Sequence, residues 1–274
     1  MSRKVFVVAL VALCILATNG LQAGESDDSM YVHVTSYKVN PADSDEWVQL
    51  GKDWVTAFAD ANMDESWDWY MSSNGFEYVI VDMHKDMASF DHGEEMQAKM
   101  VEAIGEETMA ALRESSSSID FEVVSSEVVK VRSDLSYHAG EMDGPPGFIH
   151  IGVHSVKPGM AKRFEGALGK VAEAWKQTET PGHWTTHEVT LGQGSYVVVS
   201  MAASPVAFYQ EKTTPQVLTE AFGEEETKAL YTEWRDCISD YTTQTMYPRP
   251  ELSYVAKMYA SDDSEGEGEA EGDS

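Results

Sequence analysis

The feature that most constrains the fold of this chain is an internal repeat at a spacing of 117 to 118 residues. Six segments of the first copy align in order with six segments of the second: residues 31–34 with 148–151, 39–42 with 156–159, Trp67 with Trp184, 78–83 with 196–201, 104–107 with 222–225, and 134–137 with 251–254. Because the six matches are collinear, we expect two copies of one supersecondary unit. Residues 139–147, which contain several glycines and a pair of prolines, supply the expected linker.

The sequence pattern predicts the same order of strands and helices in both copies. Strands are expected at residues 30–39, 66–72, 76–84 and 126–132, and in the second copy at 147–156, near 184 and 196, and at 243–249. Between the first two strands, apolar residues at helical spacing predict one helix, and a longer helical region is expected at 93–120 and at 215–240. Asn74-Gly75 is typical of a tight hairpin, which residues 192–194 replace in the second copy. The order β-α-β-β-α-β is that of a ferredoxin-like unit.

The central strands are apolar on both faces. Residues 79–81 and 197–199 show no polar alternation, as expected of strands that are covered on both sides. Helices on one face of a four-stranded sheet leave the other face bare, so each copy must bury the sheet of the other. We therefore predict an α+β fold in which two tandem ferredoxin-like βαββαβ repeats pack sheet to sheet as an intramolecular α+β barrel, an internal pseudo-dimer whose further association the sequence leaves open.

The two ends of the chain differ in character from the repeats. Arg3 and Lys4 precede an apolar run that ends near residue 17, so residues 1–23 have the pattern of a secretory signal peptide; an uncleaved anchor is the alternative. Residues 261–274 are acidic with no large apolar residue, which predicts a disordered tail. The expected organisation is a leader at 1–23, a first repeat at 24–138, a linker at 139–147, a second repeat at 148–260 and a tail at 261–274, in a protein exported to the periplasm or the medium.

Charge and cysteine content exclude several classes of protein. The chain has 47 Asp and Glu against 19 Lys and Arg, a formal net charge of −28, which disfavours nucleic acids and anionic membrane surfaces as partners. Of its two cysteines, Cys14 lies in the leader, so no disulfide framework and no thiolate metal site is expected. Cys237 lies in a helical pattern and is expected to be a buried thiol.

Histidines recur on one face of each opening strand. Strand alternation places His33 and Tyr37 on one face of the first strand, and His150 and His154 on the matching face of the strand at 147–156. A buried imidazole must be hydrogen-bonded or line a site, because burying it unpaired is costly. Two interpretations therefore stay open: satisfied core histidines, or a pocket in which His150 or His154 is a catalytic acid or base.

Further candidates for a ligand-facing surface come from the middle strands. His183 and His187 share a face by even spacing and would join His150 and His154 around one cavity, where the first copy has Ser66 and Tyr70. An aromatic wall is predicted from Trp67, Tyr78, Trp184 and Tyr196, although ordinary sheet packing explains these residues as well. No metal site is expected, because a His-x-x-x-His spacing spans about 13 Å along a strand.

The element order, the duplication and the strand-turn-helix start at Val156-Lys157-Pro158-Gly159 resemble the dimeric α+β barrel superfamily. That superfamily includes antibiotic-biosynthesis-type monooxygenases, haem-degrading oxygenases, chlorite-dismutase-like proteins and muconolactone isomerases. The resemblance implies a barrel that binds a small hydrophobic or aromatic molecule, as a cofactor-independent oxygenase or isomerase. A haem-binding protein, and a non-enzymatic binding or scaffold protein with a filled core, are the alternatives.

Overall fold

The structure, a computed structural model, describes residues 31–84, 86–139, 142, 144–191 and 196–256. The expected leader, the acidic tail and the turn at residues 192–194 lie outside the described residues.

The centre of the molecule is a closed antiparallel barrel of eight strands. Around the barrel the order is β4-β1-β3-β2-β9-β6-β8-β7, and a pairing of β4 with β7 closes it. A short ninth strand, β5 (Tyr137–His138), pairs with β7. The eight strands are β1 (Tyr31–Val39), β2 (Trp67–Ser72), β3 (Glu77–His84), β4 (Phe121–Val131), β6 (Phe148–Val156), β7 (His183–Leu191), β8 (Tyr196–Ala202) and β9 (Ile238–Pro248).

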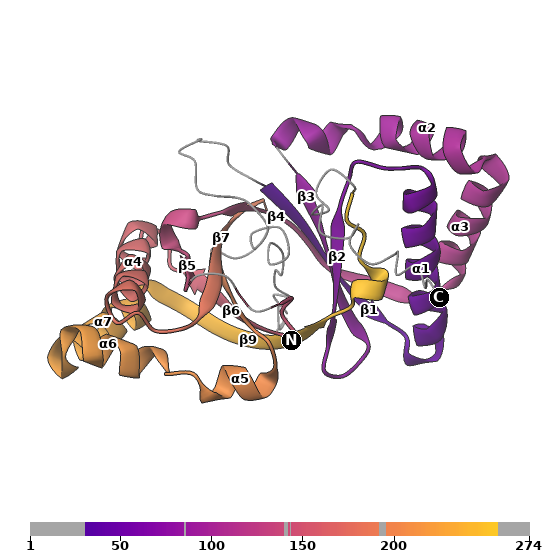
Figure 1. The fold of residues 1–274 in the computed structure, drawn as a ribbon. Helices are drawn as coiled ribbons and strands as arrows, with labels where there is room; N and C mark the ends of the chain where they lie inside the picture. The colour runs from indigo at the N-terminus through magenta and orange to yellow at the C-terminus, as the bar shows by residue number, and fades with distance from the viewer. Residues whose placement is uncertain (1–30, 85, 140–141, 143, 192–195, 257–274) are drawn as a thin grey trace, which may run out of the picture.

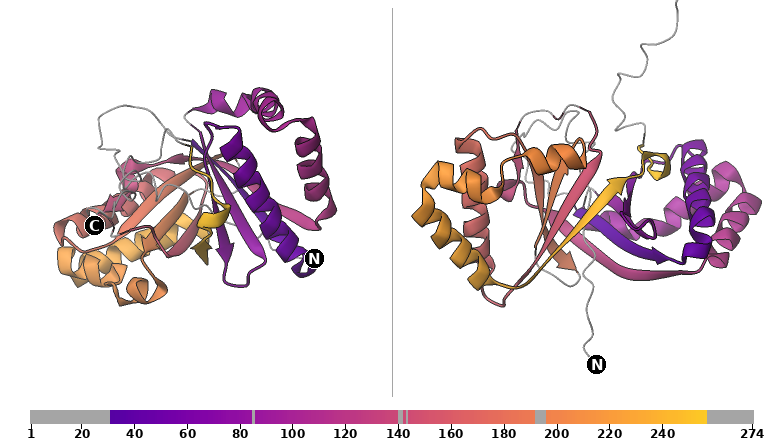
Figure 2. Two further views of the ribbon diagram at one scale, coloured as in Figure 1. Left: turned by 45° about the vertical axis from the view of Figure 1, so that its right-hand side comes forward. Right: turned by 90° about the horizontal axis from the view of Figure 1, so that it is seen from below.

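Helices cover the outside of the barrel in two groups at opposite ends of the molecule, as Figures 1 and 2 show. The first group belongs to the first half of the chain and the second group to the second half. The helices are α1 (Ser44–Asp60), α2 (Gly93–Ile104) and α3 (Glu106–Ser118), then α4 (Ala161–Gln177), α5 (Pro205–Gln210), α6 (Thr214–Phe222) and α7 (Glu224–Cys237). Short 3-10 turns lie at Pro41–Asp43, Met87–Asp91, Ser133–Leu135 and Pro250–Leu252.

Both halves contribute to one core inside the barrel. Alternate residues of each strand point inward, which makes the interior a packed cluster of branched aliphatic side chains rather than a pore. Its most buried members are Val32, Val34, Val79, Val81, Val129, Ile149, Ile151, Val197, Val199 and Met246. The expected apolar character of residues 79–81 and 197–199 on both faces is explained by this core on one side and the helices on the other.

The predicted fold class is confirmed. Within each half the strands have the order expected of a ferredoxin-like unit, and the edge strands of the two halves pair with each other as β2 with β9 and β4 with β7. The two sheets therefore continue into one another as a closed barrel. Among the described residues, no helix combines the length and the apolar character that crossing a membrane requires.

The structure differs from the sequence prediction in the long helical regions, in the start of the last strands, and in α5 and β5, which the sequence did not predict. Each long helical region is two helices that meet at a glycine with positive φ, Gly105 at 83° and Gly223 at 85°. Residues other than glycine rarely adopt this conformation, and it turns the chain between the paired helices. The last strand of each half also begins earlier than expected, at Phe121 and at Ile238.

Candidate functional site

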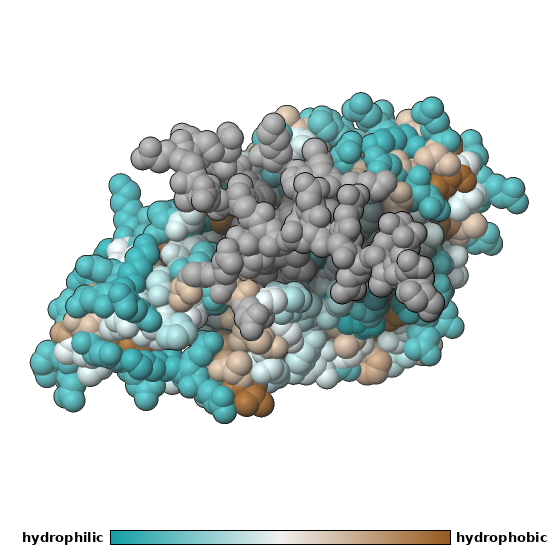
Figure 3. Space-filling view, viewed as in Figure 1, coloured by the Kyte–Doolittle hydropathy of each residue, from teal (hydrophilic) through white to brown (hydrophobic). Residues whose placement is uncertain are grey.

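A cavity of about 570 Å³ lies in the second half, between the outer face of the barrel and helices α4, α6 and α7. This volume is within the range of small-molecule sites. Its wall is mainly aromatic and aliphatic, with Leu168, Val171, Trp175, Trp184, Phe208, Leu218, Leu230, Tyr231, Trp234 and Tyr241. The cavity reaches the surface beside α5, because Tyr209 lines it and is 72% exposed. The surface over α5 carries a small hydrophobic patch beside hydrophilic residues (Figure 3).

Three imidazoles line this cavity. His150 and His154 point outward from β6, as the alternation of that strand predicts, and His183 stands at the start of β7. Burial lowers the pKa of His150 and of His183, and lowers that of His154 to about 4. The rings of all three are therefore neutral near pH 7 and able to accept or donate a hydrogen bond.

His150 differs from its equivalent in the first half. The strand registers pair His33 with Asp82 and His150 with Ser200. His33 has two polar partners: its Nδ1 lies 3.4 Å from an Asp82 carboxylate oxygen, and its Nε2 lies 2.8 Å from the Ser126 hydroxyl. His150 stacks on Phe208, with ring centroids 5.0 Å apart, and no described residue forms a hydrogen bond or an ion pair with it. Its ring nitrogens are thus available to a ligand.

His154 is held by an aromatic partner. The indole N–H of Trp234 donates to Nδ1 of His154 at 3.2 Å, and the rings of Phe164 and Tyr241 pack against the imidazole. Only 8% of His154 is exposed. The ring orientation is therefore fixed by α4, α7 and β9 together.

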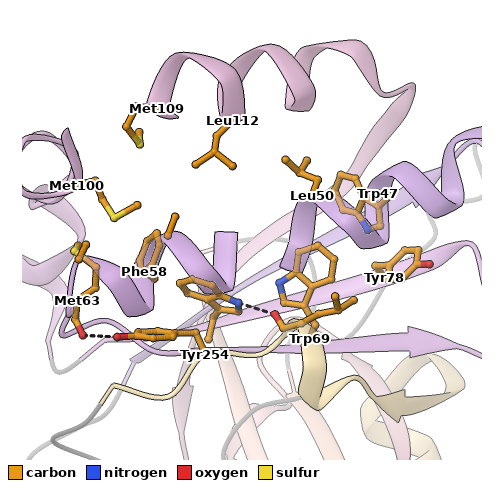
Figure 4. Close-up of a cluster of buried hydrophobic side chains, with 14 of the residues drawn as sticks. Trp47, Leu50, Phe58, Met63, Trp69, Tyr78, Met100, Met109, Leu112 and Tyr254 are labelled. Carbon is orange, nitrogen blue, oxygen red and sulfur yellow. Dashed lines mark hydrogen bonds between the residues drawn. The ribbon is translucent and has the colours of Figure 1, made fainter. Parts of the chain in front are cut away.

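The equivalent space in the first half is filled. Figure 4 shows Trp47, Leu50, Phe58 and Trp69 packed together between the helices and the sheet. Trp69 lies so close to α1 that a Cβ on Gly51 would be 3.1 Å from its ring. Where the first half has Leu50, Trp54 and Thr35, the repeat spacing places Ala167, Val171 and Gly152 in the second half. These smaller side chains line the cavity, so their size accounts for the space.

Several residues predicted to face a ligand lie elsewhere in the structure. Tyr37, Trp67 and Tyr78 belong to the packed core of the first half, where the indole N–H of Trp67 donates to the Leu252 carbonyl. Tyr196 packs on Phe164 and donates its hydroxyl to Glu165. Of the predicted aromatic wall, Trp184 lines the cavity.

His187 does not join His150 and His154 around one cavity. It points into the barrel, where it is fully buried, its Nε2 lies 2.8 Å from the Thr185 hydroxyl, and its Nδ1 has no partner. Burial lowers its pKa to about 3. The even spacing of His183 and His187 led to the prediction that both line the cavity. Only His183 does, because it is the first residue of β7 and lies at the edge of the cavity.

The sequence did not predict that residues of α7 and β9 line the cavity. Tyr231 and Trp234 lie on α7, and Tyr241 pairs with His154 across β6 and β9. Spacing on α7 identifies an apolar face but not what it covers, and the late start expected for β9 placed Tyr241 outside it. Cys237 is a buried thiol at the end of α7, as predicted, and burial raises its pKa.

Charged groups near the cavity are few. Lys212 and Glu211 line its mouth, and Lys212 pairs with Glu220 at 2.6 Å. Burial raises the pKa of Glu211. Over the described part of the chain, no cluster of three or more His, Cys, Asp or Glu side chains is arranged to hold a metal ion.

Comparison with solved structures identifies the fold. A candidate monooxygenase from Fusobacterium nucleatum subsp. nucleatum superposes with a TM-score of 0.51 at 11% identity, over 81% of this chain and 94% of that chain. An anthrone oxidase-like protein gives 0.50 at 14% identity, over 82% and 92%. A candidate chlorite dismutase gives 0.50 at 12% identity, over 82% and 96%.

This chain shares the α+β barrel fold of these neighbours. The resemblance predicted from the sequence is thereby supported for the architecture, and at these identities the likeness shows the fold alone. No known protein-family profile matches the sequence, and no curated protein matches it. The function has to be argued from the cavity.

Proposed function

We propose that this protein is an exported enzyme that binds a small neutral aromatic molecule in the cavity of its second half and removes a proton from it with His150. The observation that carries the proposal is the contrast between the two halves. His33 contacts Asp82 and Ser126, and the space beside it in the first half is filled by side chains. His150 has no hydrogen-bond partner among the described residues and lies in an aromatic-lined cavity. The signal-like sequence of residues 1–23 supports the proposed export.

The walls favour a flat, apolar ligand. Trp175, Trp184 and Trp234 offer indole faces and edges, and the ring of Phe208 holds the His150 imidazole in a stacked position. Hydrophobic contacts of this kind give affinity, while a few polar groups set the orientation. The neutral imidazole of His150 is the group best placed to accept a proton from a hydroxyl or an activated carbon of the bound ring.

Two reactions are consistent with such a base. In an isomerisation, His150 takes a proton from one atom of the substrate and returns it to another, with no co-reactant. In an oxygenation, proton removal leaves an electron-rich ring that reacts with molecular oxygen from solution. A ring CH₂ group then becomes a carbonyl that holds one oxygen atom, and the other oxygen atom leaves with the two hydrogens as water. The fold shared with a candidate monooxygenase and an anthrone oxidase-like protein supports the second reaction.

Haem is the alternative ligand. The imidazole of His150 offers the kind of nitrogen that binds haem iron, and the chlorite-dismutase-like neighbour supports this reading. The haem propionates, however, would need cations, and among the described residues that line the cavity the one cation is Lys212, which is already paired with Glu220. The residues present therefore fit a neutral ligand better than haem. A Soret band that forms on haem titration and is lost in His150→Ala would reverse this choice.

A non-enzymatic binding or scaffold protein is the other alternative. The barrel interior and the first half are filled, as that alternative expects. The second half holds a cavity, so it retains a place for a ligand even if no reaction follows. Binding without turnover would support this alternative.

Oxygen uptake in the presence of hydroxylated naphthalenes and anthracenes tests the proposal. Wild type should consume oxygen, and His150→Ala should lose about 100-fold or more in rate, the usual contribution of a positioned base. His33→Ala is the matched control, because His33 holds the equivalent place in the filled half, and it should retain the wild-type rate. Equal rates for wild type and His150→Ala would remove His150 from the mechanism.

A further inference from the structure

Gly152 forms an opening in the floor of the cavity between His150 and His154. A Cβ at this position would lie 3.2 Å from the Tyr241 hydroxyl oxygen and 3.5 Å from Nε2 of His154. In the first half the repeat spacing places Thr35 here, and its hydroxyl lies 3.4 Å from Nε2 of His33. The absence of a side chain at residue 152 therefore brings two polar atoms from neighbouring strands to the same small space.

The tautomer of His154 follows from its partner. An indole N–H can only donate, so Nδ1 of His154 must accept from Trp234 and carries no proton. Burial keeps the ring neutral, since it lowers the pKa to about 4. The single ring proton is then on Nε2, the nitrogen that faces the space above Gly152.

Tyr241 brings a second donor to the same space. Its ring lies 4.8 Å from the His154 ring, centroid to centroid, and burial raises its pKa, so the hydroxyl stays protonated. No described residue accepts a hydrogen bond from this hydroxyl. Two donors, with no acceptor of their own, thus face one point of the cavity floor.

We propose that the His154 Nε2–H and the Tyr241 O–H form a two-donor subsite above Gly152 that binds an oxygen atom of the ligand, a carbonyl or a deprotonated hydroxyl. Trp234 is a positioning residue, because it fixes the His154 tautomer without touching that oxygen. This inference rests on the proposed function and narrows its substrate to an aromatic molecule that carries such an oxygen. It also gives His154 the role of donor, so that proton removal belongs to His150 alone.

The subsite has a clear use in the reaction. When His150 takes a proton from the ligand, negative charge develops on the conjugated oxygen, and donors that are already in place stabilise this charge. His150 and His154 are four residues apart on one strand, about 13 Å, so a fused aromatic ring system would reach from one to the other.

A matched pair of probes tests the subsite. The compounds 1-tetralone and tetralin share a skeleton and differ in one carbonyl, and their binding can be followed by quenching of tryptophan fluorescence. Wild type should bind tetralone about tenfold more tightly than tetralin. In Tyr241→Phe and in His154→Phe this preference should fall to about twofold or less, because each variant removes one donor and keeps an aromatic ring. Tyr241 is 42% exposed, so its variant removes little packing.

A spectroscopic measurement tests Trp234 separately. Long-range ¹H–¹⁵N correlation of the His154 ring should show a protonated Nε2 and an unprotonated Nδ1 in wild type, and a mixture of tautomers in Trp234→Phe, which keeps the aromatic packing. A protonated Nδ1 in wild type overturns the subsite. Equal affinity of wild type for both probes also overturns it while the cavity proposal stands, whereas binding of neither probe overturns the proposed function itself.

Discussion

At the scale of single residues, the side chain paired with a histidine on the neighbouring strand decides whether its ring nitrogens are occupied by the protein or available to a ligand. His33 faces Asp82, and a carboxylate oxygen of Asp82 lies 3.4 Å from Nδ1 of the imidazole and occupies that nitrogen. His150 faces Ser200, whose hydroxyl has no charge to offer. The difference between Asp82 and Ser200 therefore leaves His150 available for a ligand.

In the variant Ser200→Asp, the new carboxylate should occupy a ring nitrogen of His150, as Asp82 does for His33. A carboxylate within about 4–6 Å favours the charged imidazole, so the pKa of His150 should rise, by about one unit. NMR titration of the His150 ring measures this, and the pH at which activity is half-maximal should rise with it. Asp82→Asn is the control, because it changes the other half and should leave the His150 titration unchanged. An unaltered His150 pKa in Ser200→Asp would show that the two side chains do not face each other.

His187 makes the stability of the barrel depend on pH. Its pKa is about 3 in the folded protein and near 6.5 when unfolded, so between these values the unfolded chain binds the extra proton and stability falls as the pH falls. His187→Gln should lose less stability than wild type from pH 7 to pH 5, by about 2 kcal/mol. Asp68, whose pKa burial raises to about 6, acts in the opposite direction but equally in both proteins.

Urea unfolding of wild type and His187→Gln at pH 7 and at pH 5 gives this difference. The same loss of stability in both proteins would mean that His187 is protonated in the folded barrel, which its buried position between Thr185 and Val197 opposes.

At the scale of elements, side-chain size on the first helix of each half decides whether the space beneath it is filled. Leu50 on α1 is packed with the tryptophans of the first half, whereas Ala167 on α4 lines the cavity. The helices have the same length, and each packs on the outer face of its own sheet. A single helix position thus carries part of the difference between a core and a site.

Ala167→Leu should fill part of the cavity. The variant is expected to bind aromatic probes at least tenfold more weakly and to gain about 0.5–2 kcal/mol in stability, the usual result of filling a cavity. Leu50→Ala is the matched control, and it should lose about 2–5 kcal/mol, since it opens a packed core. Thermal unfolding with probe titration measures both effects. Unchanged binding by Ala167→Leu would place the ligand elsewhere.

The elements themselves were largely predictable from the sequence, and the site was predictable in part. Alternation along residues 148–156 identified the outward face that carries His150 and His154, because a strand covered on both sides repeats every two residues. The turns at Gly105 and Gly223 were missed, since helical spacing continues across both glycines. Trp234 and Tyr241 were missed because their places depend on the packing of α7 and the register of β9, which no local pattern encodes.

At the scale of the whole molecule, each half completes the other. The last strand of each half runs beside the second strand of the other half, and its end is fixed there: the Arg132 N–H donates to Thr186, and the Arg249 N–H donates to Trp69. The Arg132 side chain adds ion pairs to Glu165 and Glu188 of the second half. Neither sheet could bury its inner face alone, so the halves are expected to unfold together.

A pair of substitutions in the shared core tests this coupling. Val34 and Ile151 are both buried inside the barrel, one in each half. Val34→Ala should cost about 2 kcal/mol and Ile151→Val about 1 kcal/mol, and each should lower the midpoint of one common transition. Differential scanning calorimetry shows whether one peak moves as a whole. Two peaks, of which each substitution moves only its own, would mean that the halves are independent domains, and the His150 site would then have to be stable in the second half alone.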